Sequence, residues 1–227
     1  MSTLQSKLTP TEQYHHFIRT KLLNGQVSFQ KIYKSYLEEC FKTQNYTEIA
    51  RIVADSVTFK AEDVRTEQLV DKISLSDRKA FLMFASALVQ TYGVKLNQLE
   101  TLTLIRAIHQ EGLLPAALPK FLENNYLEIS EGDEKPGLLI LELAGQPVPQ
   151  DYAMLALKCF QKFGCHQKVV EFFLRNGNLS AGLEYLARLG KHIDFDFVHF
   201  LCEKFGPADQ LKGDQKFMAQ QDSLLVL

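Results

Sequence analysis

Two cysteines and a histidine form the closest approach to a metal-ligand cluster in this sequence. Five residues separate Cys159 from Cys165, and His166 follows directly. Structural zinc sites use thiolates and imidazoles, but they space the first pair about two to four residues apart and need further ligands. Cys159 falls on an apolar helical stripe, whereas Cys165 and His166 fall in a turn. The pattern therefore favours a core cysteine, and we expect no bound metal.

The adjacent histidines His15 and His16 are candidates for general acid–base chemistry. Only one of two neighbouring rings on a helix can face inward. A catalytic pair also needs a cysteine, serine or carboxylate partner, which this spacing does not supply. Solvated or boundary histidines are the favoured interpretation.

Local motifs of common enzymes are absent from the sequence. It has no Gly-x-Gly-x-x-Gly, no phosphate-binding loop, no Gly-x-Ser-x-Gly and no His-Glu-x-x-His. Paired acid–base carboxylates need a cleft, and Glu38, Glu39 and Asp71 are expected on solvated helix faces. We therefore expect a protein that is not an enzyme, with no catalytic residues, no cofactor and no small-molecule substrate.

The composition is that of a folded protein with a large core. Of 227 residues, 46% are hydrophobic and 23% are charged, with a formal net charge of −2. Basic residues are scattered among acidic ones, so the basic stripe typical of nucleic-acid binding is missing and no nucleic acid is expected. The segment from Met1 to Gln13 lacks the apolar run of a signal peptide, and no transmembrane segment is predicted. A cytoplasmic protein with four reduced cysteines is expected.

Helix signals recur along the chain. Thr9, Pro10 and Glu12 supply an N-cap, a proline at the first helical position and a capping-box glutamate. Ser76 is predicted to cap another helix. Apolar residues at three- and four-residue spacing predict further helices over 81–92, 152–163 and 195–205. Residues 138–141 have the composition of a buried strand, but their flanking residues favour a short buried helix.

Two segments, 105–121 and 170–186, are similar to each other when Gly112 is aligned with Gly177. Each contains the end of an apolar helix, the glycine, and then x, Leu, Pro or Ser, Ala, a small residue and Leu. The glycines suit left-handed helix ends. The small residues are expected to let the next helix approach its neighbour closely. Gly145 falls about midway between the two glycines, so turns recur at intervals of about 33 residues, the length of a solenoid hairpin.

We therefore predict an all-α fold, an irregular α-solenoid of stacked antiparallel helix hairpins with about 11–13 helices. A single domain is expected over residues 1–211, with a softer junction at 56–76 where the sequence is more polar. Residues 129–135 are predicted to form an acidic loop. Residues 212–227 are expected to form a poorly ordered tail.

Candidate partner-binding residues are apolar side chains that lie beside core positions or at the end of the tail. Phe172 and Phe173 point about 100° apart around a helix, so one can meet the preceding hairpin and the other the following one. This core role is favoured over a surface hot spot. The tail's apolar end either docks on the last hairpin or contacts a partner. The candidates are Phe173, Phe197, Leu224, Leu225, Val226 and Leu227.

Several stretches occur in the order and spacing of a known family. They are residues 118–122 with 126–127, 133–136 with 138–141, 147–149, 153–157, 169–172 and 179–186. Over about 81–201 the chain thereby resembles the C-terminal helical domain of the Bulli or Mic family, the regulator subunit of the Mon–Ccz complex. Residues 1–75 match weakly, and the family's N-terminal β-propeller has no counterpart. Helical domains of Vps-type tethering subunits share the general pattern and are the near alternative.

The resemblance implies a subunit of a Rab guanine nucleotide exchange complex, located peripherally on late endosome and lysosome membranes and acting in lysosomal and autophagic traffic. It assigns exchange chemistry to partner subunits, so it transfers no catalytic residue. Three hypotheses follow. The preferred one is a scaffold subunit of an endolysosomal Rab-activating or tethering complex. The others are an unrelated helical-repeat adaptor of coat or nuclear-pore type, and a helical enzyme built around His15–His16 or Cys165–His166.

Overall fold

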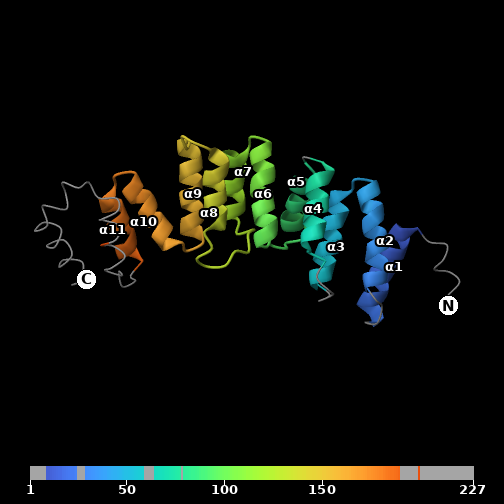
Figure 1. Cartoon of the computed structure of the whole chain (residues 1–227). Helices are drawn as coiled ribbons and strands as arrows, with labels where there is room; N and C mark the ends of the chain where they lie inside the picture. Colours follow the sequence, from blue (N-terminus) through green and yellow to red (C-terminus); the bar gives the residue numbers. More distant parts are fainter. Residues whose placement is uncertain (1–8, 25–28, 59–63, 78, 190–198, 200–227) are drawn as a thin grey trace, which may run out of the picture. The chain divides into compact units, whose positions relative to one another are not determined.

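The computed structural model describes residues 9–24, 29–58, 64–77, 79–189 and 199. Over these residues the regular secondary structure is helical, with no strand beyond one isolated bridge, which confirms the all-α prediction (Figure 1). The chain forms two compact units, unit 1 (Met1–Ile129) and unit 2 (Ser130–Leu227). Their boundary lies away from the softer junction predicted at 56–76. The single domain over 1–211, the helix at 195–205 and the tail at 212–227 stay predictions, because most or all of 190–227 lies outside the described residues.

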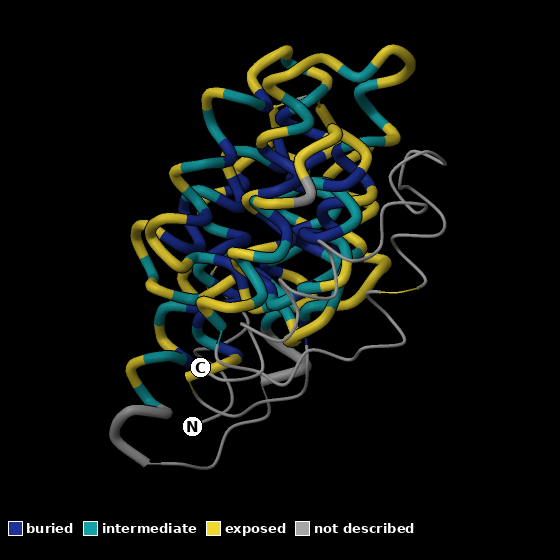
Figure 2. The backbone as a smooth tube through the Cα atoms, turned by 90° about the vertical axis from the view of Figure 1, so that its left-hand side faces the viewer, coloured by how far each residue is buried: buried dark blue, intermediate teal, exposed yellow. Residues whose placement is uncertain are grey.

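Unit 1 has seven α-helices and one π-helical segment among its described residues. They are α1 (Pro10–Asn24), α2 (Phe29–Lys42), α3 (Tyr46–Thr58), α4 (Glu67–Ser76), α5 (Ala80–Ser86), η2 (Ala87–Thr91), α6 (Gln98–Gln110) and α7 (Leu114–Glu123). The pairs α1–α2, α2–α3 and α6–α7 pack together, α3 also contacts α5 and η2, and α4 contacts α5 and α6. Buried residues line the inner helix faces, while exposed residues gather at turns and outer faces (Figure 2).

Unit 2 contains α8 (Lys135–Ala144), α9 (Gln150–Lys162), α10 (His166–Arg175) and α11 (Leu179–Arg188) among its described residues. Its main contacts join consecutive helices: α8 with α9, α9 with α10, and α10 with α11. The short helix predicted around 138–141 is confirmed by α8, which carries Pro136 in its first turn. Gly137 lets the ring of Phe160 approach so closely that an added Cβ would lie 2.3 Å from ring atom Cε1.

Helix starts follow the sequence signals at α1 but not at α5. The Thr9 N–H donates to Glu12 Oε2 (2.9 Å) and the Glu12 N–H donates to Thr9 Oγ1 (3.3 Å), which is the predicted capping box. The prediction that Ser76 caps a helix is wrong. Ser76 is the last residue of α4, and its hydroxyl donates back to the Lys72 carbonyl (2.6 Å). A serine hydroxyl in the last turn of a helix can donate to the carbonyl four residues earlier, and it is then not available to cap the next helix.

The internal similarity of the sequence corresponds to two equivalent helix pairs. Gly112, with a φ of +70°, separates α6 from α7, and Gly177, with a φ of +69°, separates α10 from α11. Both glycines occupy the left-handed region that residues with a Cβ rarely adopt. Gly145, with a φ of +70°, ends α8, which lies between them in the sequence. The predicted spacing of turns is thus confirmed.

Two backbone hydrogen bonds close the α6–α7 hairpin at its base. The Leu96 N–H donates to the Tyr126 carbonyl (2.8 Å), and the Glu128 N–H donates to the Leu96 carbonyl (2.7 Å). This is the isolated parallel bridge between Leu96 and Leu127, two fully or nearly buried leucines. The chain before α6 is therefore fastened to the chain after α7.

A buried ion pair fastens the segment before α4 to the start of α6. Arg65 Nε donates to Glu100 Oε1 (2.9 Å), a second guanidinium nitrogen contacts Glu100 Oε2, and the same nitrogen donates to the Lys95 carbonyl (2.7 Å). The Glu100 carboxylate also accepts from the Asn97 N–H (2.9 Å) in a capping box. Glu100 is 0% exposed, so every partner of its charge comes from the protein itself.

Candidate functional site

A partly buried polar network joins α1, α2 and α3. The Tyr14 hydroxyl donates to Asp55 Oδ2 (2.5 Å), and the Tyr36 hydroxyl donates to Glu48 Oε2 (2.7 Å). The two tyrosine rings stack with centroids 4.5 Å apart. Arg51 pairs with Glu48 (2.8 Å) and lies over the Tyr14 ring, 5.5 Å from its centroid. The network holds three helices together through charge-assisted hydrogen bonds.

One of the two adjacent histidines belongs to this network. His15 Nδ1 lies 3.5 Å from a guanidinium nitrogen of Arg51, whereas His16 is exposed, as expected for neighbouring helical positions. Burial is the main cause that raises the pKa of Tyr14 and of Tyr36, and their carboxylate acceptors add to it. Their hydroxyls therefore stay protonated and act as donors. The arrangement supports a structural role.

The pH dependence of stability should report on Asp55. Burial raises the pKa of this carboxyl, and the Tyr14 hydrogen bond and Arg51 oppose the rise. When the pKa of a carboxyl is higher in the folded than in the unfolded chain, the protonated carboxyl stabilises the fold. This contribution is complete below the unfolded-state pKa of about 4 and is lost as the pH rises through the folded-state pKa. Asp55→Asn keeps an acceptor for Tyr14 and removes the titration. Between about pH 4 and pH 7, we expect the urea midpoint of the native protein to fall relative to that of Asp55→Asn. A relative rise would contradict this assignment.

The cysteines that resembled metal ligands are buried thiols. Cys159 and Cys165 are 1% and 6% exposed. Burial, together with the proximity of Cys165, raises the pKa of Cys159 to about 12, and burial followed by Glu134 raises the pKa of Cys165. His166 Nδ1 lies 3.0 Å from the Tyr185 hydroxyl. Across the described ranges, no three histidine, cysteine, aspartate or glutamate side chains gather as a metal site would require.

Thiol labelling measures this burial directly. At about pH 8, we expect iodoacetamide to label Cys40, Cys159 and Cys165 at least about tenfold more slowly in the folded chain than in urea, because a buried protonated thiol is a poor nucleophile. The experiment uses a Cys202→Ser background, since Cys202 lies outside the described residues. Mass spectrometry assigns each site. Fast labelling of folded Cys165 would instead indicate an activated thiolate.

Of the candidate partner-binding residues, the structure describes only Phe173. It is half-buried on α10, with its ring edge-on to Phe172 (centroids 6.1 Å apart). A Cβ added at Gly182 on α11 would lie 3.6 Å from Phe173 Cβ, so this face of α10 meets α11. A partner-binding role for Phe173 stays a prediction. The other candidates lie outside the described residues: Phe197, Leu224, Leu225, Val226 and Leu227.

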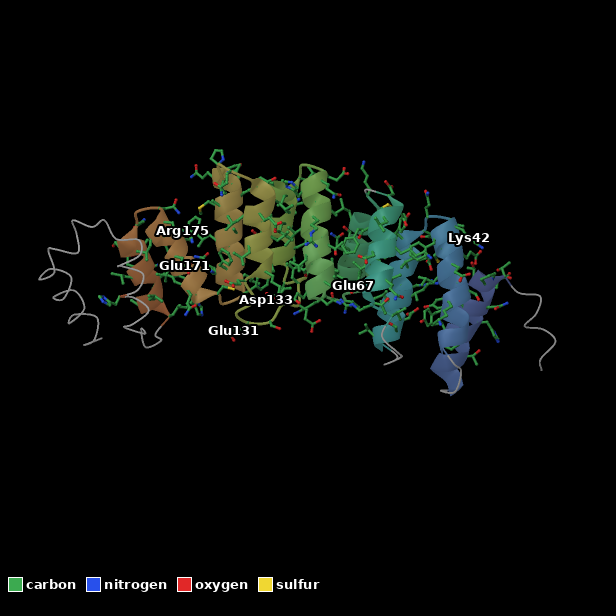
Figure 3. All side chains as sticks on the ribbon, viewed as in Figure 1. Lys42, Glu67, Glu131, Asp133, Glu171 and Arg175 are labelled. Carbon is green, nitrogen blue, oxygen red and sulfur yellow. The ribbon has the colours of Figure 1, made fainter. Side chains whose placement is uncertain are left out.

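Charged side chains of unit 2 lie mainly on its surface. Glu131 and Asp133 lie in the loop before α8, where an acidic loop was predicted, and Glu171 and Arg175 lie on α10 (Figure 3). Arg175 pairs with Glu171 at 3.8 Å. Exposed pairs of this kind stabilise a fold by at most about 1 kcal/mol and are screened by salt. This ion pair therefore contributes little to the stability of unit 2.

Among the described residues, a shallow groove of about 360 Å³ on unit 1 is a candidate binding surface. It lies between η2 and α7, with Gln90 on one side and residues of α7 and the following turn on the other. Leu113, at 52% exposure, is among the most exposed large apolar residues that the structure describes. The α7 side is lined by Leu113, Ala116, Ala117, Lys120, Phe121, Asn124 and Tyr126.

The small residues of α7 leave this groove open. Ala116 is exposed, so it does not serve the close helix approach predicted for it, and Ala117 is half-buried. The equivalent Gly182 on α11 does serve it, because it is buried against Val170 and Phe173. Phe121 and Tyr126 meet edge-on, with centroids 6.0 Å apart, and form an aromatic wall. Sequence reasoning identified the small residues but not the hollow they leave.

The fold and this surface define an all-helical repeat protein of packed helix pairs. No described helix combines the length and the hydropathy needed to cross a membrane. The chain is similar to human clathrin heavy chain 2, with 24% identity over 212 residues. The similar region covers 91% of this chain but only 12% of the clathrin heavy chain. No family model and no solved structure matches the chain.

Proposed function

We propose that this protein is a non-catalytic helical-repeat scaffold of vesicle traffic, whose role is to hold partner proteins together. The similarity to a clathrin heavy chain along 91% of the chain carries the proposal. The groove on unit 1, with the exposed side chain of Leu113 along it, offers a surface at which a partner could bind. Within the described residues, the buried thiol of Cys159 and the hydroxyl of Tyr14 have raised pKa values, so neither is an activated nucleophile.

At a finer level, we propose a subunit of an endolysosomal Rab guanine nucleotide exchange complex. The support is the sequence resemblance to the Bulli or Mic family, whose matched stretches all lie in α7 to α11 and the turns between them. In this role the protein associates with late endosomes and lysosomes through its partners and supports lysosomal and autophagic traffic. Exchange chemistry belongs to the partner subunits.

A coat or tethering role is the second candidate, and the clathrin heavy chain similarity favours it. A coat-type module and a Vps-type tethering subunit require the same kind of scaffold, because stacked helix pairs present extended binding surfaces. The two candidates differ in partners and in location within the cell. No residue described above distinguishes one role from the other.

Proximity labelling of the full chain in cells distinguishes these roles. A biotin ligase fused to the chain, followed by mass spectrometry, should enrich Mon–Ccz-type subunits on late endosomes under the first proposal. Enrichment of clathrin, coat or Vps-type subunits supports the second candidate. An unrelated helical-repeat protein fused to the same ligase is the control. If neither set exceeds the control, the trafficking role is wrong.

A further inference from the structure

The groove between η2 and α7 is an open surface rather than an enclosed pocket. Gln90, Leu113, Lys120 and Asn124 are all exposed along it. Pockets for small molecules bury about 70–90% of the ligand, and exposed walls of this kind cannot do so. A volume of about 360 Å³ is at the low end of the range for ligand pockets, so it takes only a few side chains of a short segment. An extended segment presents alternate side chains to such a surface and keeps its backbone groups available for the polar residues along it.

The polar groups along the groove define the chemistry of that peptide. Lys120 is the one charged residue among those lining it, and within the described ranges its ammonium forms no ion pair. The Asn124 side-chain amide donates to the Lys120 carbonyl (2.8 Å) and keeps its oxygen as an acceptor. Together with Gln90, it can bond a peptide backbone. Charge complementarity calls for a carboxylate opposite Lys120.

The second copy of the repeat carries a different side chain at the position of Lys120. When Gly112 is aligned with Gly177, Tyr185 on α11 stands where Lys120 stands on α7. Tyr185 packs against Val170 and Leu174 of α10 and contacts His166, whereas Lys120 is exposed. The lysine of α7 is therefore available to a partner.

We propose that this groove binds a short extended segment of a partner protein that carries a large apolar side chain next to an aspartate or glutamate. The apolar side chain lies over Ala117 between Leu113 and the aromatic wall of Phe121 and Tyr126, and the carboxylate pairs with Lys120. The proposal rests on the scaffold function above and specifies the class of partner for this one surface.

Peptide display on the intact chain tests the proposal. A phage library of random dodecapeptides is panned against the full chain, and enriched peptides are synthesised and measured by fluorescence anisotropy. Ala117→Phe fills the groove, Lys120→Glu reverses its charge, and Lys158→Glu, on the exposed surface of α9, is the matched charge control. Circular dichroism confirms that each variant is folded.

Peptides that combine a large apolar residue with an acidic one are expected. Ala117→Phe should weaken their binding by on the order of tenfold or more, since the apolar anchor loses its place. Lys120→Glu should weaken it by about threefold to tenfold, and Lys158→Glu should leave it unchanged. Panning against Lys120→Glu should select peptides without the acidic residue, which keeps the test decisive if Ala117→Phe does not fold.

Three results would overturn the proposal. They are the absence of an enriched apolar–acidic class, equal binding by wild type and Lys120→Glu, and a wild-type dimer in sedimentation that Ala117→Phe converts to a monomer. The last result would assign the groove to a second copy of the chain. Proximity labelling separates this outcome from failure of the scaffold function, because trafficking partners enriched equally by wild type and Lys120→Glu would leave that function standing.

Discussion

Arg65→Leu is expected to lower the free energy of unfolding of unit 1 by about 3–5 kcal/mol, because it leaves a fully buried carboxylate without its counter-charge. Arg65 supplies two contacts to Glu100 and one to the Lys95 carbonyl. Glu100 is 0% exposed, so water cannot replace them. Hydrogen exchange measured by mass spectrometry, peptide by peptide, will localise the loss of protection to the segment before α4 and the start of α6.

Arg188→Leu is the matched control for this prediction. It breaks an arginine–glutamate pair with Glu184 in which the side chains are 81% and 64% exposed, and its effect should stay within about 0.5 kcal/mol. The double variant Arg65→Leu/Glu100→Gln should be more stable than Arg65→Leu alone, because the buried charge is then gone. If Arg65→Leu and the native protein are equally stable, the ion pair between Arg65 and Glu100 does not stabilise the position of α6.

Gly137→Ala should destabilise unit 2, because the added Cβ would lie 2.3–2.7 Å from three atoms of the Phe160 ring. Either α8 and α9 must move apart or the ring must leave its place. Overpacking of this kind typically costs about 1–3 kcal/mol, and the helix propensity of alanine offsets at most about 1 kcal/mol of it. Urea denaturation followed by circular dichroism measures the net loss, since the chain has no tryptophan.

Gly182→Ala provides a control of the opposite sign. Its added Cβ would lie 3.6 Å from Phe173 and 3.7 Å from Val170, which is ordinary contact distance. In the interior of α11, alanine should therefore stabilise the fold by about 0.5–1 kcal/mol. If both substitutions change the free energy of unfolding in the same direction, the close approach of Phe160 to Gly137 does not limit the α8–α9 contact.

Local signals were enough to predict most of the helices. Proline and glycine delimit α8, so a run of apolar residues with the composition of a strand was correctly predicted as a helix. The turns at Gly112 and Gly177 could also be predicted, because a helix often ends in a residue with left-handed backbone conformation and glycine adopts it most readily. Ser76 shows the limit of such signals. Serine suits a helix start and a last turn alike, and α5, the helix that Ser76 was predicted to cap, has Lys79 at its N-cap without a side-chain capping hydrogen bond.

The polar network and the groove were harder to predict because their members meet only in the fold. Glu48, Arg51 and Asp55 follow a three- and four-residue spacing on α3, which puts them on one helix face, but this spacing alone does not predict a polar network. Their tyrosine partners lie on other helices, far away in sequence, and no local pattern pairs them. The groove is likewise formed by residues of separate elements, η2 and α7 with its following turn. Small residues at equivalent positions give close contact in α11 and line an open groove in α7, and no local pattern distinguishes the two cases.

The bridge between Leu96 and Leu127 also bears on how such a chain grows during evolution. The residues before α6 and after α7 are hydrogen-bonded to each other. The two ends of the α6–α7 segment are therefore adjacent in space. A gene segment that encodes such a stretch can be duplicated or removed without separating the flanking chain.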